Sequence, residues 1–472
     1  MSIDTLLLQA ATYSHQGRLD LVEPLLREVR LVAPRHLAAC LELARVFILG
    51  GRYDEAAEAL EPLSGESTDG GAEVHRRLAL AHSFAGRGRV ALAHYRRALD
   101  LEPGHGQTLH SIANLEQALG LTDAAADTWR RAVAAKPLWT MPAASGEPEF
   151  RVMWTFAPGA GNTPPDYFVE QARFDSDIFT VLNDFEYDID LLRSRAHVVV
   201  NLVSDVDRSR DVLQTVETLV EKIGRPVINP PRSIVGTDRE SIALRLAGTA
   251  GCIVPRTRRL PADEMWRLAE ETGGAAGLAF PLLIRPVGTH GGEDLEKIDD
   301  RVQIDAFVDR AAALHYYVTP FVDYRSADGY FRKYRFIYVG DEILPYHLAI
   351  DEKWKVHHIT TPMADVAWMQ DEEHAFLDDP WRVFGAPQQA ALRAIRDVIG
   401  LDYFGIDCSL SGWGEIVVFE VNATMLVHGR NDRFPYKHEA VSRIRQAFHA
   451  LLERTARVTS LNCRAPVGKD PS

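Results

Sequence analysis

Two carboxylates and one amide near the end of the chain have the types and spacing to do chemistry. Asp407 ends one apolar segment, and after a glycine-rich turn a second apolar run leads to Glu420 and Asn422. Residues two apart on a strand point to the same face, so Glu420 and Asn422 project together and a hairpin partner brings Asp407 alongside. Such a hard, oxygen-rich set suits Mg²⁺ that carries nucleotide phosphates. The spacing therefore predicts a metal site.

Simpler alternatives exist for both carboxylates. Asp407 is also suited to capping a turn, and Glu420 to an exposed edge strand. However, the run 416–419 is apolar and has the character of a buried strand. A glutamate inside such a strand needs a partner, which favours the metal site.

Upstream, a basic strand and a glycine-rich loop have the character of phosphate ligands. Residues 280–286 have the pattern of a strand that carries Arg285 among apolar neighbours, and the loop 287–292 follows directly. Backbone N–H groups in such a loop approach phosphate oxygens without side-chain hindrance. A charge in that strand also needs a reason, and phosphate contact supplies one.

The composition indicates a soluble globular protein with several folding units. The chain has 472 residues, 46% of them hydrophobic and 25% charged, which is ordinary for this class. Its net charge of −14 argues against general binding of nucleic acid or anionic membranes. No apolar run approaches the roughly 20 residues that span a bilayer. With scattered cysteines and no basic leader at the start, we expect a cytoplasmic protein with reduced thiols.

The first 140 residues repeat. Glycines recur at spacings of 34, 35 and 34 residues, at Gly17, Gly51, Gly86 and Gly120. In three of the four units a proline follows its glycine by 17 residues, at Pro34, Pro103 and Pro137. Glycine ends the first helix of a unit and proline closes the second. The second unit instead carries the polar segment 64–71, which predicts a longer loop.

This period and pattern resemble tetratricopeptide repeats. The resemblance implies an all-α helical-repeat solenoid over residues 1–140. A concave surface that binds a peptide or protein is the functional interpretation. A stacking module that only holds the rest of the chain, or a dimer partner, is the alternative.

After the linker 141–149, strand and helix patterns alternate. Residues 151–156 and the continuous apolar run 198–203 predict buried strands, and 211–223 predicts a helix. The pattern indicates an α/β layer up to about residue 233.

In this order the parts resemble the ATP-grasp superfamily, in particular its D-alanine–D-alanine ligase and glutathione synthetase-like members, over about residues 150–455. The ending acid–Glu–x–Asn carries most of the likeness, with 13 residues from Asp407 to Glu420. The resemblance implies an α+β ATP-grasp fold of three α/β subdomains, with ATP held between two of them. These are an N-terminal subdomain, a central subdomain with the phosphate loop and a C-terminal subdomain with the Mg²⁺ site, over residues 150–235, 236–325 and 326–458, and a flexible tail follows over 459–472. It implies ATP and Mg²⁺ as cofactors, and a carboxylate and an amine as substrates. Homodimers are common in the superfamily.

The resemblance also assigns roles to residues. Phosphate contacts fall to two arginines that stand where the family has lysines, and to the flexible loop: Arg239, Arg285, Gly288, Thr289, His290, Gly291 and Gly292. The adenine hinge and ribose contacts are Phe321, Val322 and Asp323. The catalytic cations are Arg332, Lys333 and Arg335, of which strand alternation favours the last two. Asp407, Glu420 and Asn422 hold Mg²⁺. Guesses from position add a substrate pocket at His428 and Arg430.

The sequence departs from the family pattern at several positions. Arginines keep the charge of the two lysines but change the geometry, and a solvated helix position is the alternative for Arg239. Gly405 stands where the ligases often carry an anion-stabilising arginine, a charge for which Arg332 or Arg335 is the substitute. The proline expected after Asn422 is absent. Four histidines are expected on the surface or in a substrate pocket rather than at a transition metal, at His347, His357, His358 and His374.

The predicted function is an ATP-dependent carboxylate–amine ligase that works through an acylphosphate and modifies a peptide or a specialised metabolite. The repeats would recruit the substrate or a partner. A small-molecule kinase of the same superfamily is the first alternative. A non-catalytic repeat scaffold with a degenerate ATP site is the second, and the replacement of two lysines motivates it.

Overall fold

The chain folds into two compact units, Met1–Leu138 and Trp139–Ser472. The structure, a computed structural model, describes residues 1–472 except 66–69, 145, 160, 271–277, 358–359, 424, 430 and 463–472. No helix in these described ranges combines the length and the apolar character that a membrane crossing requires.

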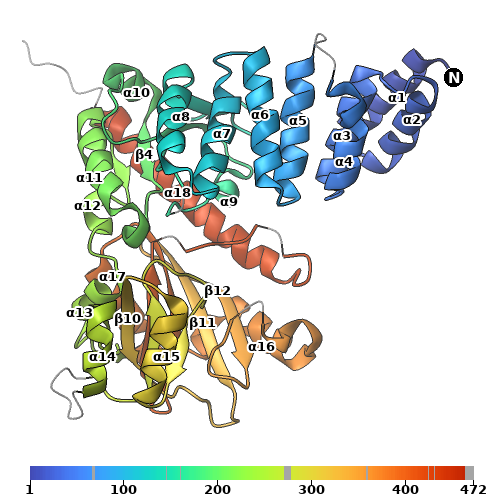
Figure 1. Ribbon diagram of the computed structural model, residues 1–472. Helices are drawn as coiled ribbons and strands as arrows, with labels where there is room; N and C mark the ends of the chain where they lie inside the picture. The colour runs from blue at the N-terminus through green and yellow to red at the C-terminus, as the bar shows by residue number, and fades with distance from the viewer. Residues whose placement is uncertain are drawn as a thin grey trace, which may run out of the picture. The chain divides into compact units, whose positions relative to one another are not determined.

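The first unit is a series of helix pairs (Figure 1). Its helices are α1 Ile3–His15, α2 Leu19–Val32, α3 Leu37–Leu49, α4 Tyr53–Leu60, η1 Glu61–Leu63, α5 Gly71–Phe84, α6 Gly88–Leu101, α7 Gly106–Ala118 and α8 Thr122–Ala135. Each repeat glycine lies just beyond the first helix of a pair with φ between 71° and 74°. Only glycine adopts this conformation at little cost, so the predicted helical repeat is confirmed. The centre of the loop predicted over 64–71 lies outside the described residues.

The second unit begins with a five-stranded sheet in the order β1-β3-β2-β4-β5. The pairs of β2 with β3 and β4, and of β4 with β5, are parallel. Its elements are β1 Leu138–Met141, β2 Arg151–Phe156, α9 Asp166–Val169, β3 Asp175–Thr180, α10 Ile189–Arg195, β4 Val198–Asn201, α11 Val206–Ile223, β5 Val227–Ile228 and α12 Pro231–Ile234. Strand β1 was not predicted, since residues 138–141 were assigned to the end of the repeats and to the linker. The Thr140 hydroxyl donates to the Asp177 carboxylate of β3 at 2.5 Å, a long-range contact that leaves no sequence pattern.

A four-stranded antiparallel sheet follows in the order β7-β10-β8-β9. The elements of this region are α13 Arg239–Leu246, β7 Arg258–Pro261, α14 Ala262–Glu270, β8 Leu282–Pro286, β9 Glu296–Ile298, α15 Val302–Ala311 and β10 His315–Pro320. Helices α14 and α15 cover one face through a core that includes Met265, Phe307 and Tyr316 (Figure 1). The other face is left for the site.

The third sheet has the order β12-β11-β13-β14-β6 and is antiparallel except for the pair of β14 and β6. Its region contains β6 Cys252–Ile253, β11 Phe331–Val339, β12 Glu342–Asp351, η2 Pro362–Asp365, α16 Ala367–Asp378, η3 Pro380–Arg382, α17 Ala386–Ile399, β13 Tyr403–Leu410, β14 Ile416–Asn422 and α18 Lys437–Asn462. Tyr334 of β11 packs edge-on against Phe376 of α16 and Phe384. Because strand side chains alternate, the residues beside Tyr334 turn to the opposite face.

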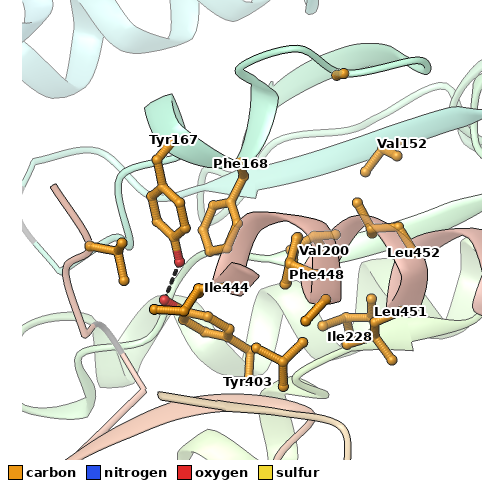
Figure 2. Packing of buried hydrophobic residues seen from close by; sticks show 14 of the residues in the cluster. Val152, Tyr167, Phe168, Val200, Ile228, Tyr403, Ile444, Phe448, Leu451 and Leu452 are labelled. Atoms are coloured by element: carbon orange, nitrogen blue, oxygen red, sulfur yellow. Dashed lines mark hydrogen bonds between the residues drawn. The ribbon is translucent and has the colours of Figure 1, made fainter. Parts of the chain in front are cut away.

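Helix α18 joins the first and third sheets through one apolar core (Figure 2). Its Phe448 lies against Phe168 and Tyr403, and the hydroxyls of Tyr167 and Tyr403 are hydrogen-bonded across the core. Both hydroxyls are buried, which makes such a bond necessary. This core holds the loops of the first sheet beside the third.

Candidate active site

A cavity of about 490 Å³ is lined by the facing sides of the second and third sheets and by loops of the first. Most of the predicted site residues line it: Arg239, Arg285, His290, Gly291, Gly292, Phe321, Val322, Lys333, Arg335, Asp407, Glu420, Asn422 and His428. They come from separate parts of the chain, and tertiary structure alone brings them together.

Three charged residues form a row across three strands of the third sheet. Arg335 of β11 lies opposite Asp407 of β13, which lies opposite Glu420 of β14. The Arg335 guanidinium donates to both oxygens of Asp407, at 2.6 and 2.9 Å, and the Lys333 ammonium lies 3.2 Å away. Burial acts to raise the pKa of Asp407, but these two cations outweigh it and hold that pKa well below its usual range. The carboxylate is therefore ionised at neutral pH.

Glu420 is paired in the same way from helix α13. Arg239 donates to its carboxylate at 2.7 Å. Although burial favours the neutral acid, Arg239 and then Arg285 lower the pKa of Glu420. Asn422, two residues along the strand, lies within 3.4 Å of the same carboxylate oxygen. Two ionised carboxylates and an amide thus share one region of the wall, a donor set that fits Mg²⁺. These residues would hold the ion.

Arg285 of β8 faces the cavity from the second sheet. Its side chain is buried, and burial together with the charge of Arg239 lowers the pKa of Arg285 to about 10. No carboxylate within the described ranges lies at ion-pair distance. The guanidinium instead donates to the hydroxyl and the carbonyl of Thr289. A buried, charged guanidinium that lacks a carboxylate is suited to an anionic ligand.

The glycine-rich loop is held over the cavity by helix α11. His290 is hydrogen-bonded to Asp205 at 2.7 Å, and Arg208 donates to the carbonyl of Gly288 at 2.9 Å. The loop follows backbone conformations that favour glycine, with φ of 80° at Gly288. Sequence reasoning missed Asp205 and Arg208, since nothing in their local pattern differs from an ordinary helix start.

The predicted adenine hinge lies at the end of β10. Phe321 contacts Trp354 edge-on at 5.7 Å, and the Lys297 ammonium lies 4.9 Å from the centre of its ring. Phe321 and Val322 line the cavity, whereas Asp323 is not among the lining residues and its carboxylate accepts from the backbone N–H of Arg325. A ribose contact from Asp323 is thus not supported.

Five further residues named in the sequence analysis have different outcomes. Arg332 turns away from the cavity and pairs with Glu372 at 2.5 Å and with Asp328 at 2.8 Å, because it alternates with Lys333. Gly288 and Thr289 do not line the main cavity, but Thr289 lines a second pocket with Arg239, Glu420 and Asn422, and the phosphate contacts of both stay predictions. Arg430 and His358 fall on residues that the structure does not describe.

His347 was expected on the surface or in a substrate pocket, and neither is its place. It lies in a buried cluster in which Glu373 accepts from His347 at 2.5 Å, from Lys437 at 2.8 Å and from Tyr436 at 2.6 Å. This cluster ties the start of α18 to strand β12 and helix α16. By contrast, His357 and His428 do line the cavity, and burial lowers the pKa of both.

Gly405, which stands where the ligases often carry an arginine, has no room for a side chain. A Cβ atom on Gly405 would lie 2.3 Å from Cγ and 2.7 Å from Cβ of Met425. No side chain fits there without displacing Met425. Of the two substitutes considered, only Arg335 faces the cavity.

A family model and several solved structures match parts of the chain. The tetratricopeptide repeat family model matches residues 14–81. In the solved structure of MamA, 74% of that chain is covered by 27% of this one, with 18% identity and a TM-score of 0.26. No curated protein matches the sequence.

Two solved ligases align with about two thirds of this chain. The D-Ala:D-Ser ligase VanG from Enterococcus faecalis is 14% identical, with 66% of this chain and 100% of that chain covered and a TM-score of 0.39. The D-cycloserine synthetase DcsG is 16% identical, with 64% and 99% covered and a TM-score of 0.41. At this distance the site must be judged by its own geometry.

Proposed function

We propose that the ATP-grasp-type unit is an ATP-dependent ligase that joins a carboxylate to an amine and forms ADP. One observation carries the proposal: a cavity in which four cations, Arg239, Arg285, Lys333 and Arg335, surround two ionised carboxylates. Cations suited to phosphate and oxygen ligands suited to a metal ion are the two components that phosphoryl transfer requires. Mg²⁺ would supply charge neutralisation of the triphosphate when bound.

In the proposed reaction, an oxygen of the substrate carboxylate attacks the γ-phosphorus, the bond to the bridging oxygen breaks, and ADP leaves. The amine nitrogen then attacks the acyl carbon of the acylphosphate, loses a proton, and displaces inorganic phosphate. Arg285 and Arg239 would bind the transferring phosphoryl group, Lys333 would bind the neighbouring phosphates of ATP, and Arg335 would bind the substrate carboxylate. The loop held by His290 and Arg208 would keep water from the acylphosphate.

The rest of the predicted function is also part of the proposal. The substrate class would be a peptide or specialised metabolite, and the repeats would recruit it or a partner protein. The placement of the predicted phosphate and metal residues in one cavity argues against a degenerate site. A kinase differs in its product, which is a stable phosphate ester.

Calorimetric titration of the full chain with ATP, with and without Mg²⁺, tests the site. Glu420→Ala should weaken Mg²⁺-dependent binding by at least about ten-fold, or about 1.4 kcal/mol. Glu415→Ala is the matched control, because that carboxylate lies exposed on the same hairpin. Absence of binding at millimolar ATP would contradict the proposal, and equal affinity of the two variants would remove Glu420 from the site.

A further inference from the structure

Charged side chains around the cavity are unequally divided. The described lining residues include six lysines and arginines but three carboxylates, an excess of three positive charges. The cations are Arg208, Arg239, Arg285, Lys333, Arg335 and Lys355. A triphosphate with one Mg²⁺ retains about two negative charges. About one positive charge is then left for the second substrate, which matches a carboxylate without a compensating ammonium.

Each of the three lining carboxylates already has a cationic or hydrogen-bonding partner. Asp205 is bonded to His290 at 2.7 Å and lies 3.6 Å from Arg208. Asp407 is shared by Arg335 and Lys333, and Glu420 is bound by Arg239 at 2.7 Å. An ammonium group that leaves water needs a counter-charge. Within the described wall, none of these carboxylates is left for it.

The cavity wall also includes an exposed lysine beside the glycine-rich loop and two apolar side chains. The Lys355 ammonium donates to the carbonyl of Leu295 at 2.9 Å, and no carboxylate in the described ranges lies at ion-pair distance from it. Met425 and Leu426 supply apolar wall. Asn162, which also lines the cavity, uses its amide to close its own loop through both backbone groups of Ala157.

We infer that the acid activated here carries no ammonium beside its carboxylate. Either the nitrogen next to the carboxylate is acylated, as at a peptide C-terminus or in an N-acyl amino acid, or the acid has no such nitrogen. The inference rests on the proposed function and narrows its substrate class. Free α-amino acids are excluded as donors, since their ammonium would enter a site with surplus positive charge.

The test uses the full chain with ATP, Mg²⁺ and hydroxylamine, which converts an acylphosphate to a hydroxamate. A pool of common amino acids is compared with a pool of their N-acetyl derivatives, and propionate is a third arm. The N-acetyl pool should give at least about ten-fold more hydroxamate than the free pool. More hydroxamate from propionate than from the N-acetyl pool would assign the preference to simple acids, which also lack an ammonium and so agree with the inference.

Two outcomes would overturn the inference without touching the ATP site. One is equal or greater hydroxamate from free amino acids. The other is no hydroxamate from any arm while Mg²⁺-dependent ATP binding persists. Loss of ATP binding itself would instead contradict the proposed function.

Lys355 provides a matched pair of variants. Lys355→Gln keeps a donor for the Leu295 carbonyl but removes the charge, whereas Lys355→Arg keeps the charge. In the glutamine variant, the ratio of hydroxamate from the N-acetyl pool to hydroxamate from the free pool should fall below about three-fold. In the arginine variant this ratio should stay as in the wild type. An unchanged preference in Lys355→Gln would mean that the surplus charge does not act on the acid.

Discussion

Arg335 and Asp407 lie directly opposite each other on neighbouring strands, and two hydrogen bonds of 2.6 and 2.9 Å join them inside the protein. A pair of this kind is a bidentate, charge-assisted contact that neither partner leaves without a large cost. It makes Asp407 both a candidate metal ligand and a structural partner of β11.

Removal of the cation tests the structural part of this relationship. Arg335→Gln leaves the buried Asp407 carboxylate with Lys333 as its remaining cation, so the free energy of unfolding should fall by roughly 3 kcal/mol. Arg335→Lys keeps the charge but loses the fork geometry and should cost less. Denaturant unfolding followed by tryptophan fluorescence measures both. A loss below about 0.5 kcal/mol in the glutamine variant would show that Asp407 finds other partners.

Neighbouring cations on opposite faces of β11 provide a second prediction. Lys333→Gln should reduce Mg²⁺-dependent ATP affinity about ten-fold, whereas Arg332→Gln should leave it within about two-fold. The reason is that Lys333 lines the cavity and Arg332 pairs with Glu372 and Asp328 on the other face. Calorimetry distinguishes the two. Equal losses would mean that the face assignment does not govern binding.

Gly405 and Met425 allow a third prediction. Gly405→Ala places a methyl group against the Met425 side chain and should destabilise the fold by about 1–3 kcal/mol through overpacking. The double variant Gly405→Ala/Met425→Ala should lose less stability than the sum of the losses in the two single variants, because the smaller residue at position 425 makes room for the new methyl group. A double-mutant cycle in chemical denaturation measures the coupling. Strict additivity would contradict the predicted clash.

The buried histidine makes stability depend on pH. Burial, with the charge of Lys437, lowers the pKa of His347 from 6.5 to about 4. Between these values the unfolded chain binds a proton that the folded protein does not, so the free energy of unfolding falls as pH falls, by about 3 kcal/mol at pH 4. His347→Gln should remove this slope.

The exposed His374→Gln serves as the control and should keep the wild-type profile. Burial opposes ionisation of Glu373, but His347 and Lys437 lower its pKa to about 2. The stability contributed by the ionised Glu373 is fully present above its ordinary pKa of 4.5 and is lost as the pH falls toward 2. This second decrease in the free energy of unfolding should persist in part in the His347→Gln variant. A His347→Gln profile identical to wild type between pH 6.5 and 4 would exclude the histidine as the cause.

The hydrogen bond between Asp205 and His290, which holds the glycine-rich loop, yields a fifth prediction. Asp205→Asn keeps the shape of the side chain but weakens its bond to His290, so the amides of 288–292 should exchange hydrogen faster, by roughly three-fold to ten-fold. Asp299→Asn, at an exposed pair with Lys297, is the matched control. Mass-spectrometric hydrogen exchange in the absence of ATP measures it. Unchanged exchange would mean that other contacts hold the loop.

Local pattern was enough to predict much of this protein. The repeat glycines and their spacing predict helix pairs because a left-handed residue must end each first helix. The order of strands and the acid–Glu–x–Asn ending predict the fold class and the two carboxylates. Alternation along 331–335 predicts which cations share a face, because the strand period is two.

Long-range contact decided what no local pattern records. Asp205 and Arg208 reach the phosphate loop from another subdomain, Met425 fills the space over Gly405, and Lys355 enters the cavity from a loop. The same holds for the Glu373 cluster, whose members are distant in sequence. Burial and pairing set the charge of these groups, and both depend on packing between segments. The sequence alone therefore determined the fold class and most of the candidate site residues, and only the tertiary structure decided the charge balance of the site.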